Sequence, residues 1–536
     1  MIPASFIKKR MTVKIKRVIC IIFCALLVMS GCRADRAAKE ASDDKYRTTY
    51  EIFVGSFCDS NGDGTGDLNG IRSKLDYIED LGFNALWLTP VHPSSTYHKY
   101  DVDDYYAIDP AFGTMEDYEA LLNECHERGI RVYMDLVLNH TSNDHAWFRA
   151  ASDYLHELPE GWDPDPSYCK YYDYYNFTRE PADGFTQLEG TGWYYESGFW
   201  SEMPELNLSS AAVREEIRGI MEYWLGKGVD GFRLDAVTSY YKDDTEANKE
   251  FLTFLTETAR GIDPDCYLVG EAWTDRDTIA YLYGSGIDSL FDFPFAGPDG
   301  IIAGTLRSGR PARDYVENMV QTEKAYENAS PAAVDAPFYT NHDMDRSAEY
   351  YPDDSGSAVK MAYAMSLFMT GNAFVYYGEE LGMGGAGKDE NRRAPMYWSD
   401  DPADPDMCAP PPYMDEVSMR FPSAADQMKD DGSIYNWFRE VIRIRNEYPA
   451  LARGTTENAA SLSDDQTAAF FRRSETYGDL LIVMNLSPQT AEKKLKKAGK
   501  TFRLTEVLTT NGESIKYKGG VLSLPAYSIA VFTADR

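Results

Sequence analysis

One order of elements recurs along the chain, and it limits the possible folds more than any other feature. Amphipathic helical segments are each followed by a glycine and then by a short apolar segment of strand length. Helices that alternate with strands in this way predict parallel βαβ units. The predicted strands are apolar on both faces, as parallel strands covered by helices are. They span residues 85–88, 130–138, a segment that reaches 235, 266–269 and 373–377.

An acidic residue stands at the end of four predicted strands: Asp135, Asp235, Glu271 and Asp343. In a (β/α)8 barrel the C-terminal ends of the strands form the active face, so these acids would surround one mouth. A doubly wound sheet also alternates strands and helices, but the glycine-rich phosphate fingerprint that such folds often use is absent from the sequence. The sequence therefore predicts an α/β fold, a (β/α)8 TIM barrel.

The helix–strand order is interrupted twice. Residues 141–204 are rich in Tyr, Trp, Pro, Gly and Asp and are too long for a bare loop, so they predict a small domain inserted after strand 3. After residue 452, short apolar segments predict a C-terminal antiparallel β-sandwich domain. The expected division is a signal peptide (1–31), a tether (32–47), a barrel in two parts (48–140 and 205–452), the inserted domain (141–204) and the C-terminal domain (453–536).

The N-terminus has the composition of an export signal. A basic segment precedes an apolar run at 18–29, which is too short to span a bilayer comfortably. Small residues then stand directly before Cys32. This resembles the bacterial lipoprotein signal, in which Cys32 would carry lipid and anchor the exported chain to the membrane at the cell surface. A plain signal peptide cut nearby, which would leave the protein secreted, is the alternative.

Charge and cysteine content exclude several functions. The chain has 53 Lys plus Arg against 86 Asp plus Glu, a formal net charge of -33. Such a chain repels a phosphate backbone, so we expect no nucleic-acid partner. Five cysteines remain after Cys32, widely spaced and without CxxC pairs, which predicts neither a disulfide framework nor a thiolate metal site.

Five segments carry a resemblance to a known family. Residues 135–140 (DLVLNH), 231–235 (GFRLD), 270–273 (GEAW) and 341–343 (NHD) resemble, in order, the four signatures of the α-amylase family, glycoside hydrolase family 13. Residues 203–207 (MPELN) resemble the extra region that the family has near the end of its inserted domain. The resemblance implies the family's barrel, inserted domain and C-terminal β domain, and the N-terminal signal adds the lipoprotein anchor.

The resemblance also implies catalytic roles. Retaining glycosidases use one carboxylate as nucleophile and a second as acid/base, roughly 5–5.5 Å apart. Asp235 would be the nucleophile, Glu271 the acid/base, and Asp343 would stabilise the oxocarbenium-like transition state. Arg233 lies two residues before Asp235, on the same side of the strand, where its charge favours the ionised carboxylate.

Further residues would contact the sugar at the cleavage point. His140 and His342 would donate hydrogen bonds, and the segment 97–101 resembles the family segment whose Tyr stacks on that sugar. The family often has Gly where this chain has Lys99. The substrate-binding residues implied are His98, Tyr100, His140, Arg233, His342 and Arg346, of which Arg346 would pair with an acidic neighbour at the rim.

An oxygen-rich, glycine-spaced loop follows the first predicted strand. Its alternate oxygens suit a hard cation such as Ca2+. It resembles the metal loop after the first barrel strand in many α-amylase relatives, which implies a structural Ca2+ as cofactor; a run of Asx-turns without metal is the alternative. The implied ligands are Asp59, Asn61, Asp63, Thr65 (through its carbonyl) and Asp67.

The residue directly after the predicted nucleophile indicates which type of glycosidic bond is cleaved. Relatives that cut α-1,6 bonds tend to have Val there, and this chain has Ala236. We therefore expect an α-1,4-glucan hydrolase of α-amylase type, with starch or maltooligosaccharide as substrate. The alternatives are a neopullulanase-, cyclomaltodextrinase-like or transglycosylating enzyme, and, from another class, a catalytically silent starch-binding lipoprotein.

Overall fold

A computed structural model describes residues 45–242, 244–495 and 502–534 of the chain. Residues 45–536 cluster as one compact unit. The predicted signal peptide, the lipidation site Cys32 and almost all of the tether lie outside the described residues. Within the described part of the chain, none of the helices combines the length and the apolar character that crossing a bilayer needs.

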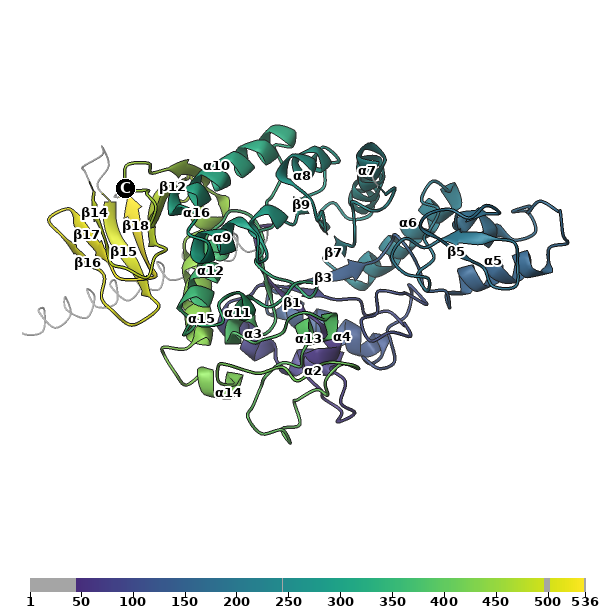
Figure 1. Ribbon diagram of the computed structural model, residues 1–536, viewed down its shortest axis with the longest axis horizontal. Coiled ribbons are helices and arrows are strands. Elements are labelled where there is room, and N and C mark those ends of the chain that lie inside the picture. Colours follow the sequence, from purple (N-terminus) through teal and green to yellow (C-terminus); the bar gives the residue numbers. More distant parts are fainter. Residues whose placement is uncertain (1–44, 243, 496–501, 535–536) are drawn as a thin grey trace, which may run out of the picture. The chain divides into compact units, whose positions relative to one another are not determined.

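A parallel sheet forms the centre of the fold (Figure 1). Its strand order is β10-β1-β2-β3-β7-β8-β9. An extended segment at 336–340 closes the remaining gap, because Phe291 pairs in parallel with Ala336 and the Phe374 N–H donates to the Pro337 carbonyl at 2.9 Å. The strands are β1 (Thr48–Ile52), β2 (Ala85–Leu88), β3 (Arg131–Leu136), β7 (Gly231–Leu234), β8 (Tyr267–Gly270), β9 (Ser289–Leu290) and β10 (Ala373–Tyr376).

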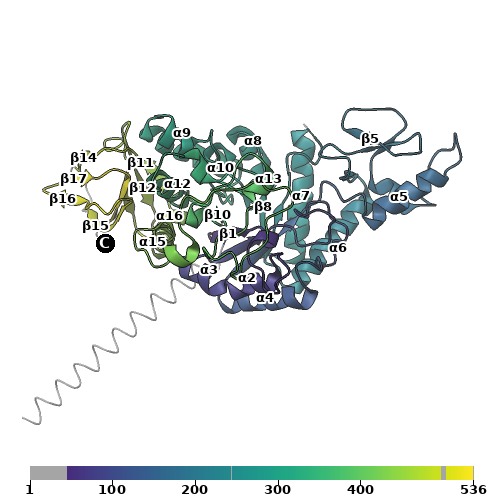
Figure 2. The same cartoon turned by 60° about the horizontal axis from the view of Figure 1, so that its bottom comes forward.

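Helices follow the strands in chain order, and Figure 2 shows them around the sheet. Local signals set their ends: a capping box between Thr114 and Asp117 starts α4, and left-handed Gly228 ends α6. The helices are α2 (Leu68–Ser73), α3 (Leu75–Leu81), α4 (Met115–Glu127), α5 (Ala146–Glu157), α6 (Ala211–Lys227), α7 (Thr245–Ile262), α8 (Arg276–Tyr283), α9 (Ile301–Arg307), α10 (Ala312–Ala329), α11 (Ser347–Tyr350), α12 (Ser357–Leu367), α13 (Asp389–Arg392), α14 (Ala424–Gln427), α15 (Ile434–Glu447) and α16 (Ala450–Arg453), with 3-10 turns η1 (Val54–Ser56), η2 (Lys170–Tyr174), η3 (Phe293–Phe295) and η4 (Glu379–Leu381).

Aromatic side chains fill the inside of the barrel. Trp87, Tyr133, Tyr267, Phe291 and Phe374 belong to one buried cluster contributed by different strands and the segment after β9. A barrel interior packed in this way is a core and not a pore, so any ligand must bind at its mouth.

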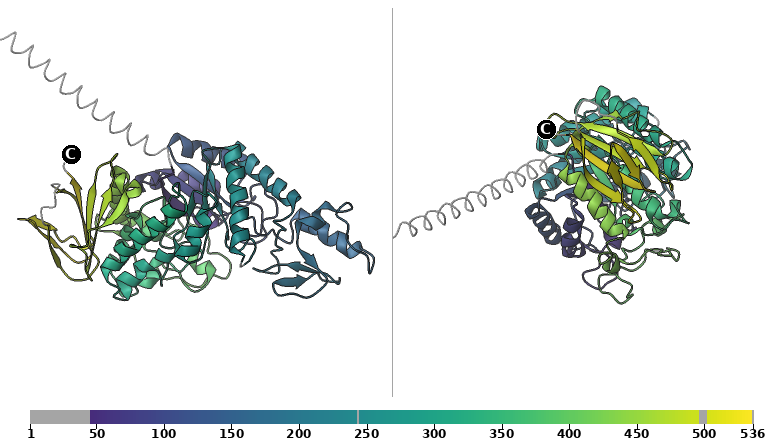
Figure 3. Two further views of the ribbon diagram at one scale, coloured as in Figure 1. Left: turned by 90° about the horizontal axis from the view of Figure 1, so that it is seen from above. Right: turned by 90° about the vertical axis from the view of Figure 1, so that its left-hand side faces the viewer.

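Two antiparallel regions interrupt and follow the barrel. Between β3 and α6, a small sheet of β4 (Phe177–Thr178), β5 (Phe185–Gln187) and β6 (Tyr194–Glu196) has the order β4-β6-β5. After α16, a five-stranded sheet has the order β11-β12-β13-β18-β15 and a three-stranded sheet the order β14-β17-β16 (Figure 3). Their strands are β11 (Thr455–Asn458), β12 (Thr467–Arg473), β13 (Leu480–Asn485), β14 (Ala491–Lys494), β15 (Phe502–Thr509), β16 (Lys516–Lys518), β17 (Val521–Leu524) and β18 (Ser528–Ala534). The predicted fold class is confirmed.

Candidate active site

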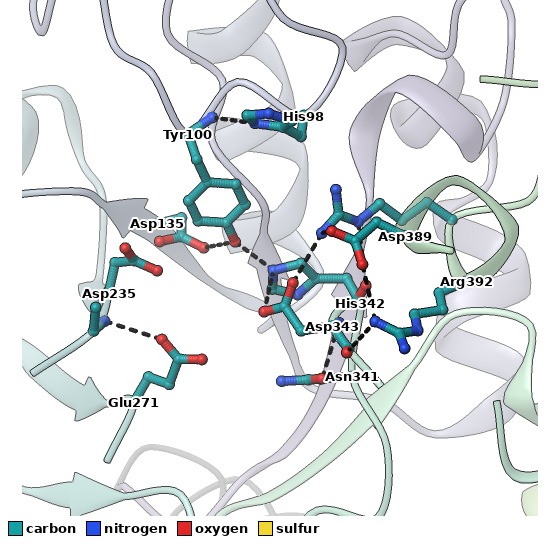
Figure 4. Close-up of polar contacts among 12 residues, drawn as sticks. His98, Tyr100, Asp135, Asp235, Glu271, Asn341, His342, Asp343, Asp389 and Arg392 are labelled. Atoms are coloured by element: carbon teal, nitrogen blue, oxygen red, sulfur yellow. Dashed lines mark hydrogen bonds and ion pairs between the residues drawn. The ribbon is translucent and has the colours of Figure 1, made fainter. Parts of the chain in front are cut away.

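A buried guanidinium ties three strand-end acids together. Arg233, on β7, is fully buried and contacts the carboxylates of Asp135 at 2.9 Å, Asp235 at 2.5 Å and Glu271 at 2.9 Å. The acids come from three neighbouring strands, β3, β7 and β8, whose C-terminal ends meet at one mouth (Figure 4). The expected pairing of Arg233 with the carboxylate two residues later is therefore present.

Backbone strain after β7 positions the second carboxylate. Ala236 has φ 46°, in the left-handed region, which costs roughly 1–2 kcal/mol for a residue with a side chain. Its N–H donates to Glu271 Oε2 at 3.0 Å. Burial raises the pKa of Glu271 to about 7, with Asp235 and Asp343 adding to the rise and Arg233 opposing it. Glu271 can therefore hold a proton near neutral pH.

Asp343 is held by two cations. Its Oδ1 accepts a hydrogen bond from Arg393 at 2.8 Å, and its Oδ2 lies 3.1 Å from His342 Nε2. Burial alone would raise the pKa of Asp343, but the charges of His342 and Arg393 outweigh that effect and lower it. Its side chain keeps 29% exposure, so an ionised carboxylate faces the mouth.

Tyr100 connects the two sides of the site. Its ring stacks on His342 with an interplanar angle of 8°, and its hydroxyl donates to Asp135 at 2.9 Å. His98 Nδ1 accepts from the Tyr100 backbone N–H at 3.1 Å, and His140 Nε2 lies 3.2 Å from the Tyr100 carbonyl. The structure thus brings the histidines of the three sequence motifs to one tyrosine.

The position of Lys99 explains how a side chain replaces the glycine that the family often has. Lys99 keeps the left-handed backbone that glycine would adopt, with φ 66°. Its ammonium pairs with Asp109 at 2.7 Å, and both side chains are nearly buried. This ion pair, with the hydrogen bond from the Lys99 ammonium to the Ser94 carbonyl at 3.0 Å, holds the loop that presents Tyr100.

The prediction that Arg346 lies at the rim is wrong. Its side chain is fully buried, donates to the Tyr377 carbonyl at 2.6 Å and pairs with Glu379 at 3.7 Å. The acidic partner exists, but the pair lies behind the site because Arg346 begins α11 and turns into the packed layer. Arg393 instead reaches Asp343.

Sequence reasoning missed three residues of the site: Glu51, Trp87 and Arg393. Trp87 donates from its indole N–H to Asp135 at 3.2 Å, and Arg393 also donates to the Tyr97 hydroxyl at 2.9 Å. Arg393 follows α13, outside the segments that resemble family signatures. The adjacent basic pair Arg392–Arg393 in an acidic chain was a signal that could have drawn attention to it.

The predicted calcium loop lies between η1 and α2. Asp59 accepts hydrogen bonds from the N–H groups of Gly62 and Gly64 at 2.7 Å each, and Asp67 caps α2 through Gly70 N–H at 2.7 Å. Across the described residues, no group of three or more His, Cys, Asp or Glu side chains is arranged to hold a metal ion. The predicted ligands also include the Asn61 side chain and the Thr65 carbonyl, and the Ca2+ site stays a prediction.

Comparisons with known proteins agree with this geometry. Residues 51–454 match the family described as "Alpha amylase, catalytic domain". Alpha-amylase 3 of Dictyoglomus thermophilum is 38% identical over 453 residues, covering 82% of this chain and 84% of the relative. Glucan 1,6-alpha-glucosidase of Streptococcus pneumoniae is 30% identical over 524 residues, covering 83% and 92%.

A solved structure extends the similarity beyond the barrel. Eubacterium rectale Amy13B superposes with a TM-score of 0.90 at 45% identity, covering 92% of this chain and 96% of that one. The family match alone includes more than half of the 536 residues, and it contains all the acids gathered at the mouth. The chain therefore belongs to the α-amylase family of glycoside hydrolases.

Proposed function

We propose that this enzyme is a retaining hydrolase of α-1,4-glucosidic bonds in starch or maltooligosaccharides. One observation carries the proposal: Asp235 and Glu271 both contact one buried guanidinium, and burial raises the pKa of Glu271 to about 7. A charged nucleophile beside a protonated acid is the pair that retaining glycosidases need.

In this proposal the reaction has two displacements. Asp235 attacks the anomeric carbon, its oxygen bonds to that carbon, and the glycosidic C–O bond breaks while Glu271 gives its proton to the leaving oxygen. Glu271, now ionised, then takes a proton from water, whose oxygen displaces Asp235. The ionised Asp343 stabilises the positive charge that develops on the sugar ring in both steps.

Two features support α-1,4 cleavage of a sugar polymer. Ala236 stands where relatives that cut α-1,6 bonds tend to have Val. Trp273, two residues after the acid, is 54% exposed and stacks on Phe293 at 4.9 Å, so its free face offers a flat surface for a leaving sugar. The relatives include both an amylase and a 1,6-glucosidase, so the decisive measurement compares cleavage of the two bond types.

A product profile on amylose, pullulan and a cyclodextrin tests the proposal. Amylose should be the best substrate, and the first product should have the α-anomeric configuration by early-time NMR. Preferred cleavage of the cyclodextrin or pullulan would favour the cyclomaltodextrinase- or neopullulanase-like alternative, and long transfer products would favour transglycosylation. A folded protein that binds starch without turnover would instead be the silent binding lipoprotein.

We also propose that the enzyme is exported and held on the membrane by lipid on Cys32. A single acyl chain binds only marginally, and stable anchoring needs more than one. Cys32→Ala should release the protein from the membrane or leave its signal uncut, without changing kcat. Wild-type protein wholly in the culture fluid, with no lipid on Cys32, would leave plain secretion as the explanation.

A further inference from the structure

A second acid–histidine contact joins Glu51 of β1 to His342, the residue before Asp343. Glu51, on β1, and His342 are each about 1% exposed, and Glu51 Oε1 lies 2.6 Å from His342 Nδ1. The same carboxylate oxygen accepts the His342 backbone N–H at 3.3 Å. The edge of Trp87 closes one side of the imidazole, with ring centroids 5.6 Å apart. The contact is therefore shielded from water, and the backbone hydrogen bond and the Trp87 ring hold the imidazole in place.

The other ring nitrogen of His342 also faces acceptors. Nε2 lies 3.1 Å from Asp343 Oδ2 and 2.7 Å from the Tyr100 hydroxyl oxygen. The Tyr100 hydroxyl gives its own proton to Asp135, so towards His342 it accepts. A neutral imidazole donates from only one nitrogen, whereas an imidazolium donates from both. The geometry on both sides of the ring therefore fits the protonated form.

We propose that Glu51 is a positioning residue that keeps His342 protonated and oriented, so that His342 holds Asp343 and Tyr100 against the sugar at the cleavage point. The proposal rests on the retaining hydrolase function given above. Glu51 acts through His342 and touches no reacting atom.

The charges around His342 decide its protonation. Asp343 and Glu51 face its two nitrogens, and Arg393 Nε donates to the His342 carbonyl at 3.2 Å. Asp135 interacts with the charge of His342, and Arg233 interacts with that of Glu51. Burial alone would lower the pKa of His342, but Asp343 and Glu51 outweigh burial and raise it to about 10.

Glu51→Gln separates the charge of Glu51 from its shape. The glutamine oxygen can still accept from Nδ1–H, so the orientation of the imidazole is kept while the charge is lost. Losing an opposite charge in contact lowers a pKa by about 1–3 units, which brings the pKa of His342 into roughly 7–9. His342 then loses its proton within the range where wild-type activity is still measurable.

The readout is the alkaline limb of kcat/KM on an α-glucoside that the wild type cleaves. In the wild type only Glu271 should lose a proton, which gives about a tenfold loss per pH unit. In Glu51→Gln a second proton is lost, so the ratio of wild-type to variant kcat/KM should be small at pH 6 and rise about tenfold per pH unit above the His342 pKa. A ratio that stays constant from pH 6 to 10 would overturn the proposal.

Glu380→Gln is the matched control. Glu380 is a fully buried acid that contacts the hydroxyls of Tyr50 and Tyr77 at 2.7 Å each and has no contact with His342. Burial raises the pKa of Glu380 to about 7, so above pH 7 its variant lacks a buried carboxylate charge beside the same strand. Its kcat/KM should still fall with the loss of one proton only, as in the wild type. If kcat/KM of this control also falls with the loss of a second proton, loss of any buried charge produces the effect.

A double variant tests the route through His342 and serves if Glu51→Gln does not fold by circular dichroism. Glu51→Gln combined with His342→Gln removes both charges of the pair. Its kcat/KM should equal that of His342→Gln alone within about threefold, because residues that act as one unit do not add. A further tenfold loss would show that Glu51 acts by another route. A wild type that cleaves no α-glucoside would refute the function proposed above, and not the Glu51 contact.

Discussion

The alkaline limb of the pH profile gives the most direct test of the assigned acid. Glu271 must carry a proton to protonate the leaving oxygen, so activity is present below its pKa and is lost above it. Burial, with the charges of Asp235 and Asp343, raises that pKa to about 7. The pKa of Asp343 is lowered and that of His342 is raised to about 10, so neither group titrates between pH 7 and 9.

The size of the effect follows from one proton. With a pKa near 7, about one Glu271 in eleven is protonated at pH 8 and about one in a hundred at pH 9, so kcat/KM should fall about tenfold per unit. Initial rates on a maltooligosaccharide, measured below KM from pH 5 to 9, give the limb directly. The protein should be assayed only where circular dichroism shows that it stays folded.

A substrate whose leaving group needs no proton distinguishes deprotonation of Glu271 from a general loss of active-site structure at high pH. In α-maltosyl fluoride the leaving group is fluoride, which needs no proton from the enzyme. The glycosylation step on this substrate should therefore keep its rate up to pH 8 and should persist in Glu271→Gln. A limb that is flat to pH 9 on the natural substrate would refute the assignment of Glu271. If the glycosylation rate on α-maltosyl fluoride falls with pH in the same way, a group other than Glu271 titrates.

Three further changes test other parts of the site. Asp235→Asn should fold, as circular dichroism can show, and lose nearly all turnover, because the covalent path is closed; substantial starch hydrolysis would contradict its role. Arg393→Lys keeps the charge but cannot donate to both Asp343 and Tyr97, so kcat/KM should fall roughly 10- to 150-fold, the equivalent of about 1.5–3 kcal/mol. Chelation of Ca2+ from the 59–67 loop should lower Tm more than the initial rate, and an unchanged Tm would identify ordinary turns.

The barrel could be predicted from the sequence where a strand follows a helix and a glycine. The predicted strands at 85–88 and 266–269 agree with β2 and β8 to within one residue. The closing part of the barrel could not be predicted, because β9 has two residues and the segment at 336–340 is joined to its neighbours by an isolated bridge and separate backbone hydrogen bonds, without a regular strand ladder. Short exposed strands such as β16 (Lys516–Lys518) also lack an apolar pattern.

The site was predictable to the extent that strand ends fix side chains in space. Asp235 and Glu271 follow β7 and β8, so their sequence positions alone place them side by side. Arg346 was misplaced because nearness to a motif does not reveal which way a side chain turns at a helix start. Glu51 and Arg393 come from distant parts of the chain, and only the closed barrel brings them to His342 and Asp343.

Unequal sharing of cations explains how similar acids at one mouth take different roles. Asp343 contacts two cations, His342 and Arg393, and they outweigh the effect of its burial. Glu271 shares Arg233 with two other carboxylates. The stabilisation that Glu271 receives from this one cation does not outweigh the effect of burial, so its pKa is raised. Two carboxylates at one mouth can thus differ in protonation at the same pH. The division between proton donor and charge stabiliser therefore arises from the placement of Arg233, His342 and Arg393 more than from the acids themselves.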